Sequence, residues 1–190
     1  MITKVIAALA LSTALAAQAL EASAANKPVD VPPAYRLIAI PHGVPPEVLY
    51  SVALQESGTP INGKLVPWPW TLNVAGKGYR FATRSDACRA LMIALATNSP
   101  GRVDVGLGQT NIRANGHRYT YPCEGLDPHI NLRVTATILA EQKAASDGSW
   151  VTAAGRYHRP AGGAPAARYR EAFSRHLSRV TGTNLLVTNP

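Results

Sequence analysis

Residues 45–58 read PPEVLYSVALQESG, and this stretch predicts a helix that begins at the two prolines and ends before the glycine. Proline suits the first helical turn, where the N–H group of any residue lacks an intrahelical partner. Leu49, Val52 and Ala53 recur at helical spacing and define one apolar face. Glu56 continues that face, seven residues after Leu49.

Glu56 is therefore the first candidate for chemistry. A carboxyl group that faces the core is desolvated, and desolvation raises its pKa. A carboxyl group that keeps its proton at neutral pH can act as a general acid, which glycoside cleavage requires at the leaving oxygen. The alternative is that Glu56 is a solvated residue without a catalytic role, at the end of a helix that Gly58 terminates.

The remaining pattern predicts a mainly α fold with one small β element. Two further helices are expected over about 86–97, with Ser85 as the N-cap, and over 127–145. The others are expected over 150–156 and from Pro165 onward. A hairpin is expected over 71–81 with its turn at 76–78, after a loop at 67–70. Residues 103–112 fit a strand or a short helix equally well.

Composition excludes several classes of protein. Of the 190 residues, 46% are hydrophobic and 16% charged, and the 15 Gly and 15 Pro are too few for a collagen or a low-complexity chain. The net charge is +8, with a pI near 9.9, so anionic partners are expected: nucleic acid, a membrane surface or a cell-wall polymer. One domain is expected over 35–182, followed by a tail over 183–190.

The N-terminus has the pattern of a secretory signal peptide. Lys4 precedes an apolar run over 5–17, and Ala22-Ser23-Ala24 offers a small-x-small cleavage site, with an earlier site after Ala19. The run is shorter than the ~20 apolar residues of a membrane span. We expect a signal over 1–24, a linker over 25–34 and an exported protein; the alternative is a buried N-terminal helix or an uncleaved anchor.

Cys88 and Cys123 are the two cysteines of the chain. Disulfides form in oxidising compartments, so export favours a bridge between them over two buried thiols. The loop-entropy model gives a bridge across 35 residues about 4 kcal/mol.

Four segments, in order, resemble the lytic transglycosylase domain of the goose-type lysozyme fold. ALQESG at 53–58 matches the Glu-Ser signature of that family. GLGQTN at 106–111 is similar to its Gly-Leu-Met-Gln-Ile-Asn segment, with Gly for Met and Thr for Ile. DPHINL at 127–132 resembles its Asp-Pro-x-x-Asn-Ile helix start, and RYH at 156–158 stands where the family has Ala-Tyr-Asn.

The resemblance covers about residues 45–160 and implies an α+β lysozyme-like fold, a helical bundle around a glycan-binding groove. PWPWTLNVAG at 67–76 and VDVGLGQ at 103–109 are similar to the branch of the family associated with conjugation and type IV secretion. That branch opens peptidoglycan so that an envelope-spanning complex can assemble. A periplasmic location, peptidoglycan strands as substrate and such a complex as partner are therefore expected.

In this family one glutamate protonates the oxygen between N-acetylmuramic acid and N-acetylglucosamine, and then acts as a base on the muramyl C6 hydroxyl. The product is a 1,6-anhydro sugar, formed without added water. The resemblance gives this part to Glu56. One carboxylate suffices, because the substrate supplies the nucleophile and no second acid must place a water. The resemblance implies no metal or other cofactor.

The resemblance also implies substrate-binding roles for other residues. Ser57 is expected to hydrogen-bond near Glu56 or the substrate, or else to cap the helix end. Gln109 is expected to line the glycan groove, or else to pin a loop through its amide. Tyr157 is expected near the catalytic acid, with a core aromatic as the alternative. His158 replaces the family asparagine, so its contribution changes with its charge.

Three residues of the 67–76 segment are further candidates for glycan contact. Trp68 and Trp70 can stack on sugars or anchor their own loop. Asn73 can contact an N-acetyl group or serve the following turn.

Two rival functions follow from the same residues. A lysozyme-like inverting muramidase would use Asp104 to position a water opposite Glu56. A non-catalytic peptidoglycan-binding assembly protein would keep the fold alone. We expect no nucleic-acid partner, because no stacking platform is visible, no membrane span in the mature chain, and a monomer.

Overall fold

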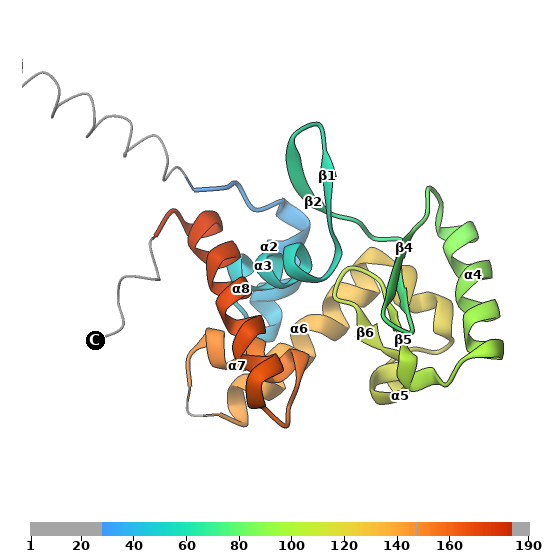
Figure 1. The fold of residues 1–190 in the computed structure, drawn as a ribbon. Coiled ribbons are helices and arrows are strands. Elements are labelled where there is room, and N and C mark those ends of the chain that lie inside the picture. Colours follow the sequence, from blue (N-terminus) through green and yellow to red (C-terminus); the bar gives the residue numbers. More distant parts are fainter. Residues whose placement is uncertain (1–27, 147, 184–190) are drawn as a thin grey trace, which may run out of the picture.

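The computed structural model describes residues 28–146 and 148–183, so the expected signal peptide and the tail after Thr183 lie outside the described part. The described chain is mainly helical with a small antiparallel sheet, which confirms the expected fold class at this level (Figure 1). The α-helices are α2 (Pro33–Ala39), α3 (Pro46–Ser57), α4 (Arg84–Thr97), α5 (Ile112–Asn115), α6 (Pro128–Ala144), α7 (Trp150–His158) and α8 (Gly163–Thr181). The 3-10 helices are η1 (Ile40–His42), η2 (Pro100–Arg102), η3 (Gly116–Arg118) and η4 (Pro122–Leu126).

Helix α3 is the centre of the larger core. It packs against α2, α6 and α8, and α7 closes the group by packing on α6 and α8 (Figure 1). The predicted apolar face is buried, but burial extends around the whole helix, because every residue from Val48 to Leu54 is buried. A helix buried on all sides is typical of a core helix, so α3 is held by tertiary packing rather than by one amphipathic face.

The expected linker over 25–34 contributes to this core where it is described. Val31 is buried, the Val29 N–H donates to the Val180 carbonyl at 3.1 Å, and α2 already begins at Pro33. The final helix α8 presents Tyr169, Phe173 and the following apolar residues to α3, as their spacing predicts.

The strands form two antiparallel sheets. Strands β1 (Gly58–Ile61) and β2 (Lys64–Pro67) pair alone, and the second sheet has the order β4-β3-β5-β6. Its members are β3 (Thr71–Val74), β4 (Lys77–Arg80), β5 (Val103–Val105) and β6 (Thr110–Asn111). Residues 103–112 therefore contain two short strands and the start of α5, which settles the ambiguity in their pattern.

Two turns differ from expectation. The β3–β4 hairpin turns at Ala75-Gly76, one residue earlier than predicted, and both residues have positive φ, at 55° and 88°. The β1–β2 hairpin was not predicted. Its signal was Asn62-Gly63, the dipeptide that favours a two-residue hairpin turn, and these residues have φ of 49° and 74°.

A second, smaller core lies between the sheet and α4. It contains Leu72, Leu91, Val105 and Leu126, and the predicted Cys88–Cys123 disulfide joins α4 to η4 with Cα atoms 5.3 Å apart. The N-cap of α4 is Thr83, whose side chain accepts from the Asp86 N–H, and not Ser85. The prediction of Ser85 as the N-cap was wrong, because the helix already begins at Arg84.

We expect Cys88→Ser to lower the free energy of unfolding by about 4 kcal/mol, because the unfolded chain regains the entropy of a 35-residue loop. Thermal unfolding under oxidising conditions measures this as a drop in Tm of about 10 °C. The matched control is the wild type with reductant added, which should lose the same stability. Two free thiols in the unreduced wild type would contradict the prediction.

Within the described residues, no single helix is long and apolar enough to cross a membrane, although the bent pair Pro33–His42 and Pro46–Ser57 passes that test jointly by length and composition.

Candidate active site

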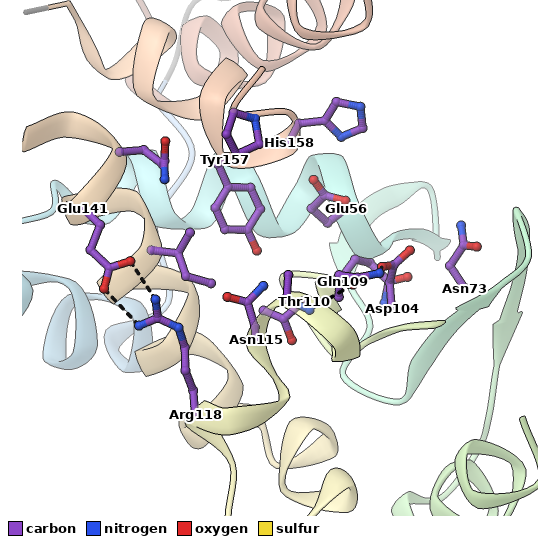
Figure 2. Close-up of a pocket in the computed structure, with 15 residues that line it drawn as sticks. Glu56, Asn73, Asp104, Gln109, Thr110, Asn115, Arg118, Glu141, Tyr157 and His158 are labelled. Atoms are coloured by element: carbon purple, nitrogen blue, oxygen red, sulfur yellow. Dashed lines mark hydrogen bonds and ion pairs between the residues drawn. The ribbon is translucent and has the colours of Figure 1, made fainter. Parts of the chain in front are cut away.

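A pocket of about 500 Å³ lies where the helical core meets the β3–β6 sheet (Figure 2). Polar side chains dominate its wall. Of the predicted site residues, the pocket brings together Glu56, Asn73, Asp104, Gln109, Tyr157 and His158. These residues come from α3, β3, β5, the β5–β6 turn and the end of α7, so segments separated by a hundred residues share one cavity.

Glu56 stands in the last turn of α3 and is half-buried, with its carboxyl group at the pocket. Burial, which has the largest effect, and the negative charge of Asp104 together raise the pKa of this carboxyl to about 8. The Tyr169 hydroxyl acts in the opposite direction. With a pKa near 8, roughly nine-tenths of the Glu56 side chains carry a proton at pH 7.

Tyr169 was expected only as a core residue of the last helix. Its ring is buried, and its hydroxyl makes no hydrogen bond of good geometry among the described residues, yet it lies close enough to Glu56 to stabilise the carboxylate. The negative charge of Glu56 in turn helps burial to raise the pKa of Tyr169 well above its ordinary value. No local pattern indicates this second role, because an aromatic residue on the apolar face of a helix is typical of core packing.

Tyr157 lies beside Glu56 (Figure 2). Its hydroxyl donates to the carbonyl oxygen of Gly108. Burial, followed by the charge of Glu56, raises the pKa of Tyr157 well above its ordinary value. The hydroxyl therefore stays protonated and holds α7 against the loop that follows β5.

This loop, 106–109, requires its two glycines. Gly106 has φ of 81°, and a Cβ there would lie 2.2 Å from the Gly125 carbonyl oxygen. A Cβ on Gly108 would lie 2.0 Å from the Thr135 hydroxyl. The site at Gly108 thus has no room for a larger side chain, because Thr135 of α6 and Tyr157 pack directly on the backbone.

Asn131, the asparagine of the DPHINL segment, is fully buried and fixes the loop from the other side. Its Oδ1 accepts from the Gly108 N–H at 2.8 Å, and its Nδ2 donates to the Val105 carbonyl at 3.0 Å. Asp127 caps α6, since its Oδ1 accepts from the N–H groups of His129 and Ile130. The segment that predicted a helix start therefore also positions the pocket wall.

Ser57 does not line the pocket. It is fully buried, and its hydroxyl makes hydrogen bonds of good geometry with the Ala53 carbonyl at 3.0 Å and the Leu107 carbonyl at 2.9 Å. Of the expected roles, the structure shows the one at the helix end: a side chain without solvent exposure holds the end of α3 against the glycine loop. Ser57 thereby fixes the backbone next to Glu56.

Gln109 lines the pocket and also pins its own loop. Its Nε2 donates to the Gly106 carbonyl at 2.8 Å and to the Thr71 carbonyl at 3.1 Å. Asn73 likewise lines the pocket while its Oδ1 accepts from the Gly76 N–H at 2.9 Å. Both amides therefore have the structural roles that the sequence left open, and both line the pocket, while contact with a sugar stays a prediction.

Asp104 and His158 stand on the pocket rim. Burial raises the pKa of Asp104, and the hydrogen bond that the Asn111 amide donates to it at 2.8 Å lowers that pKa in part. His158 stacks on the ring of Tyr169, with centroids 4.6 Å apart. Partial burial lowers the pKa of His158, although the negative charge of Asp104 acts to raise it. The imidazole is therefore mainly neutral at pH 7.

The two tryptophans lie outside the pocket. Trp68 donates from Nε1 to the Phe81 carbonyl at 2.7 Å, and Trp70 packs against the second core. Their rings meet edge to face, 5.7 Å apart. Partly buried Trp70 thus anchors the loop between the two sheets, which is one of its two expected roles, and its contact with a sugar stays a prediction.

The part of the chain over 28–146 and 148–183 contains no cluster of three or more His, Cys, Asp or Glu that could hold a metal ion. Searches against family models, curated proteins and solved structures find no match to this chain. The chemical interpretation therefore depends on the geometry of the pocket and on the sequence segments that line it.

Proposed function

We propose that this chain is a peptidoglycan lytic transglycosylase that cleaves the bond between N-acetylmuramic acid and N-acetylglucosamine and leaves 1,6-anhydro ends. The observation that carries the proposal is Glu56, a carboxyl with a pKa of about 8 at the wall of a pocket of about 500 Å³. Three of the four segments that resemble this family contribute residues to that pocket, and the fourth supports it through Asn131.

The proposed reaction needs only one carboxyl group. Protonated Glu56 donates its proton to the glycosidic oxygen as the bond from that oxygen to C1 breaks. The Glu56 carboxylate then takes the proton of the muramyl C6 hydroxyl, whose oxygen bonds to C1. The carboxyl ends protonated, as it began. Tyr169 stabilises the charged intermediate state of Glu56, and burial favours the protonated state.

Asp104 supports a second candidate, an inverting muramidase. It lines the same pocket, and its charge acts on Glu56, so it could direct a water to the sugar face opposite the acid. A third candidate, peptidoglycan binding without cleavage, leaves the raised pKa of Glu56 without a use.

Product analysis separates the three candidates. We expect purified sacculi treated with the wild-type protein to release muropeptides with anhydro-muramyl ends, each lighter by one water than the hydrolytic product. Mass spectrometry measures this directly. Hydrolytic ends that are released by the wild type but not by Asp104→Asn would identify the muramidase instead. Sacculi that stay intact would support the third candidate, peptidoglycan binding without cleavage.

A place for the reaction follows from the same proposal. A disulfide between Cys88 and Cys123 fits an exported protein. We propose the periplasm as its location and a conjugation or type IV secretion complex as its partner, on the basis of the 67–76 and 103–109 segments.

A further inference from the structure

The pocket continues beyond the catalytic candidate to a second end, which carries both a positive and a negative side chain. Four residues form this charged end: Asn115 on α5, Arg118 on η3, and Glu141 and Gln142 on α6. In Figure 2, Glu56 and Tyr157 lie between the charged end and Asp104. A strand that places a glycosidic bond at Glu56 extends in both directions, so one of its arms reaches the charged end.

An ion pair dominates the charged end. The Arg118 guanidinium donates from Nη1 to one Glu141 carboxylate oxygen at 3.0 Å and from Nη2 to the other at 2.7 Å. The two side chains keep 24% and 48% of their exposure, so both charges remain accessible to a ligand. Bidentate pairing uses two of the five guanidinium N–H donors, and the carboxylate keeps free lone pairs.

Two polar atoms at this end make no hydrogen bond among the described residues. They are Nε of Arg118 and Oε1 of Gln142, a donor and an acceptor covered by neighbouring atoms. A polar atom without a partner costs free energy, and small side-chain rotations toward a polar ligand would recover it. The charged end therefore suits a ligand that brings both donors and acceptors.

The charges of Arg118 and Glu141 indicate which part of peptidoglycan the charged end would bind. The sugar rings of a glycan strand carry hydroxyl and acetamido groups and need no ion pair for recognition. The short peptide on the muramyl residue carries carboxylates and, in many walls, a free amine. A guanidinium next to a carboxylate complements such a zwitterion, because each ionised group meets its opposite.

We propose that the charged end binds the peptide carried by the muramyl residue, with Arg118 facing a peptide carboxylate and Glu141 facing a peptide amine. The inference rests on the proposed function, since it takes peptidoglycan as the ligand. It makes Arg118 and Glu141 determinants of specificity: the protein selects strands that still carry peptide over bare glycan.

Binding tests this in the Glu56→Gln protein, where cleavage does not enter the measurement. The probes are soluble peptidoglycan strands with their peptides, and the same strands after amidase removal of the peptides. We expect tighter binding of the peptide-bearing strands, and we expect Arg118→Gln to reduce that preference about tenfold. The double change Arg118→Gln and Glu141→Gln should reduce it equally, while leaving no unpaired charge that could unfold the site.

Arg89→Gln is the matched control, because Arg89 is also paired with a carboxylate, Asp86, but lies on α4 away from the pocket. It should keep the full preference. Equal binding of the two strands by the Glu56→Gln protein, a preference that survives the loss of Arg118 and Glu141, or an equal loss in Arg89→Gln would overturn the proposal. Absence of released products from the wild type overturns the proposed function instead, and the two results are read separately.

Discussion

Glu56→Gln is expected to lower the release of peptidoglycan fragments by about 10³-fold, because glutamine can neither donate the proton that breaks the glycosidic bond nor accept the one that closes the anhydro ring. The change is nearly isosteric and leaves the surroundings of α3 in place. Release of soluble muropeptides from purified sacculi measures the effect.

Glu47→Gln is the matched control for this prediction. Glu47 stands in the first turn of the same helix, outside the pocket, with only a 3.9 Å contact to Arg36. It should keep wild-type activity, since an exposed pair of this kind contributes little. Equal activity of Glu56→Gln and wild type would remove the assignment of Glu56 as the acid.

The same carboxyl sets the expected pH dependence. Its folded pKa of about 8 lies above the unfolded value of 4.5, so activity that needs the proton falls about tenfold per pH unit above 8. Stability follows the same sign: the contribution of Glu56 is complete below pH 4.5 and is lost as pH rises through 8. Glu56→Gln should therefore be more stable than wild type at pH 9 while inactive, which thermal unfolding at several pH values checks.

Gly106→Ala is expected to lower the free energy of unfolding by about 4 kcal/mol. The new Cβ would lie 2.2 Å from the Gly125 carbonyl oxygen, which is backbone, and 2.5 Å from the Asn131 amide nitrogen that holds the loop. Neither the Gly125 carbonyl nor the Asn131 amide can move away from the new Cβ without displacing the loop that carries Gln109. Denaturant titration measures the loss, and glycan cleavage should fall with it.

Gly76→Ala isolates the part of this effect that comes from φ. Gly76 has φ of 88°, close to the 81° of Gly106, but a Cβ there meets nothing within 4 Å. The expected cost is about 1 kcal/mol, the strain of a left-handed residue alone. Equal costs at the two positions would mean that close packing against Gly125 does not govern the loop.

Features that depend on nearest neighbours in the chain were predictable. The helix ending in Glu56, the cap at Asp127 and the β3–β4 hairpin follow from proline, capping and turn chemistry that act within a few residues. The β1–β2 hairpin was missed although its Asn62-Gly63 turn is a local signal, because prolines in both strands weakened the strand pattern.

The pairing of distant side chains was not predictable. Trp70 and Ser57 lie in the segments that resemble the family, yet both face protein, whereas Tyr169 comes from a helix read as core and reaches the carboxyl. Arg118 and Glu141 are 23 residues apart, and nothing in their local sequence joins them.

By itself, the sequence determined where the candidate acid, Glu56, stands: in the last turn of an apolar helix, in a chain whose two cysteines have only each other as partners. Only the tertiary structure decided what surrounds that acid. The pKa of Glu56 depends on its burial, on Tyr169 of α8 and on Asp104 of β5, and the charged end depends on η3 meeting α6. Helical spacing is set by backbone geometry over a few residues, but desolvation and ion pairing are set by packing between elements far apart in the chain.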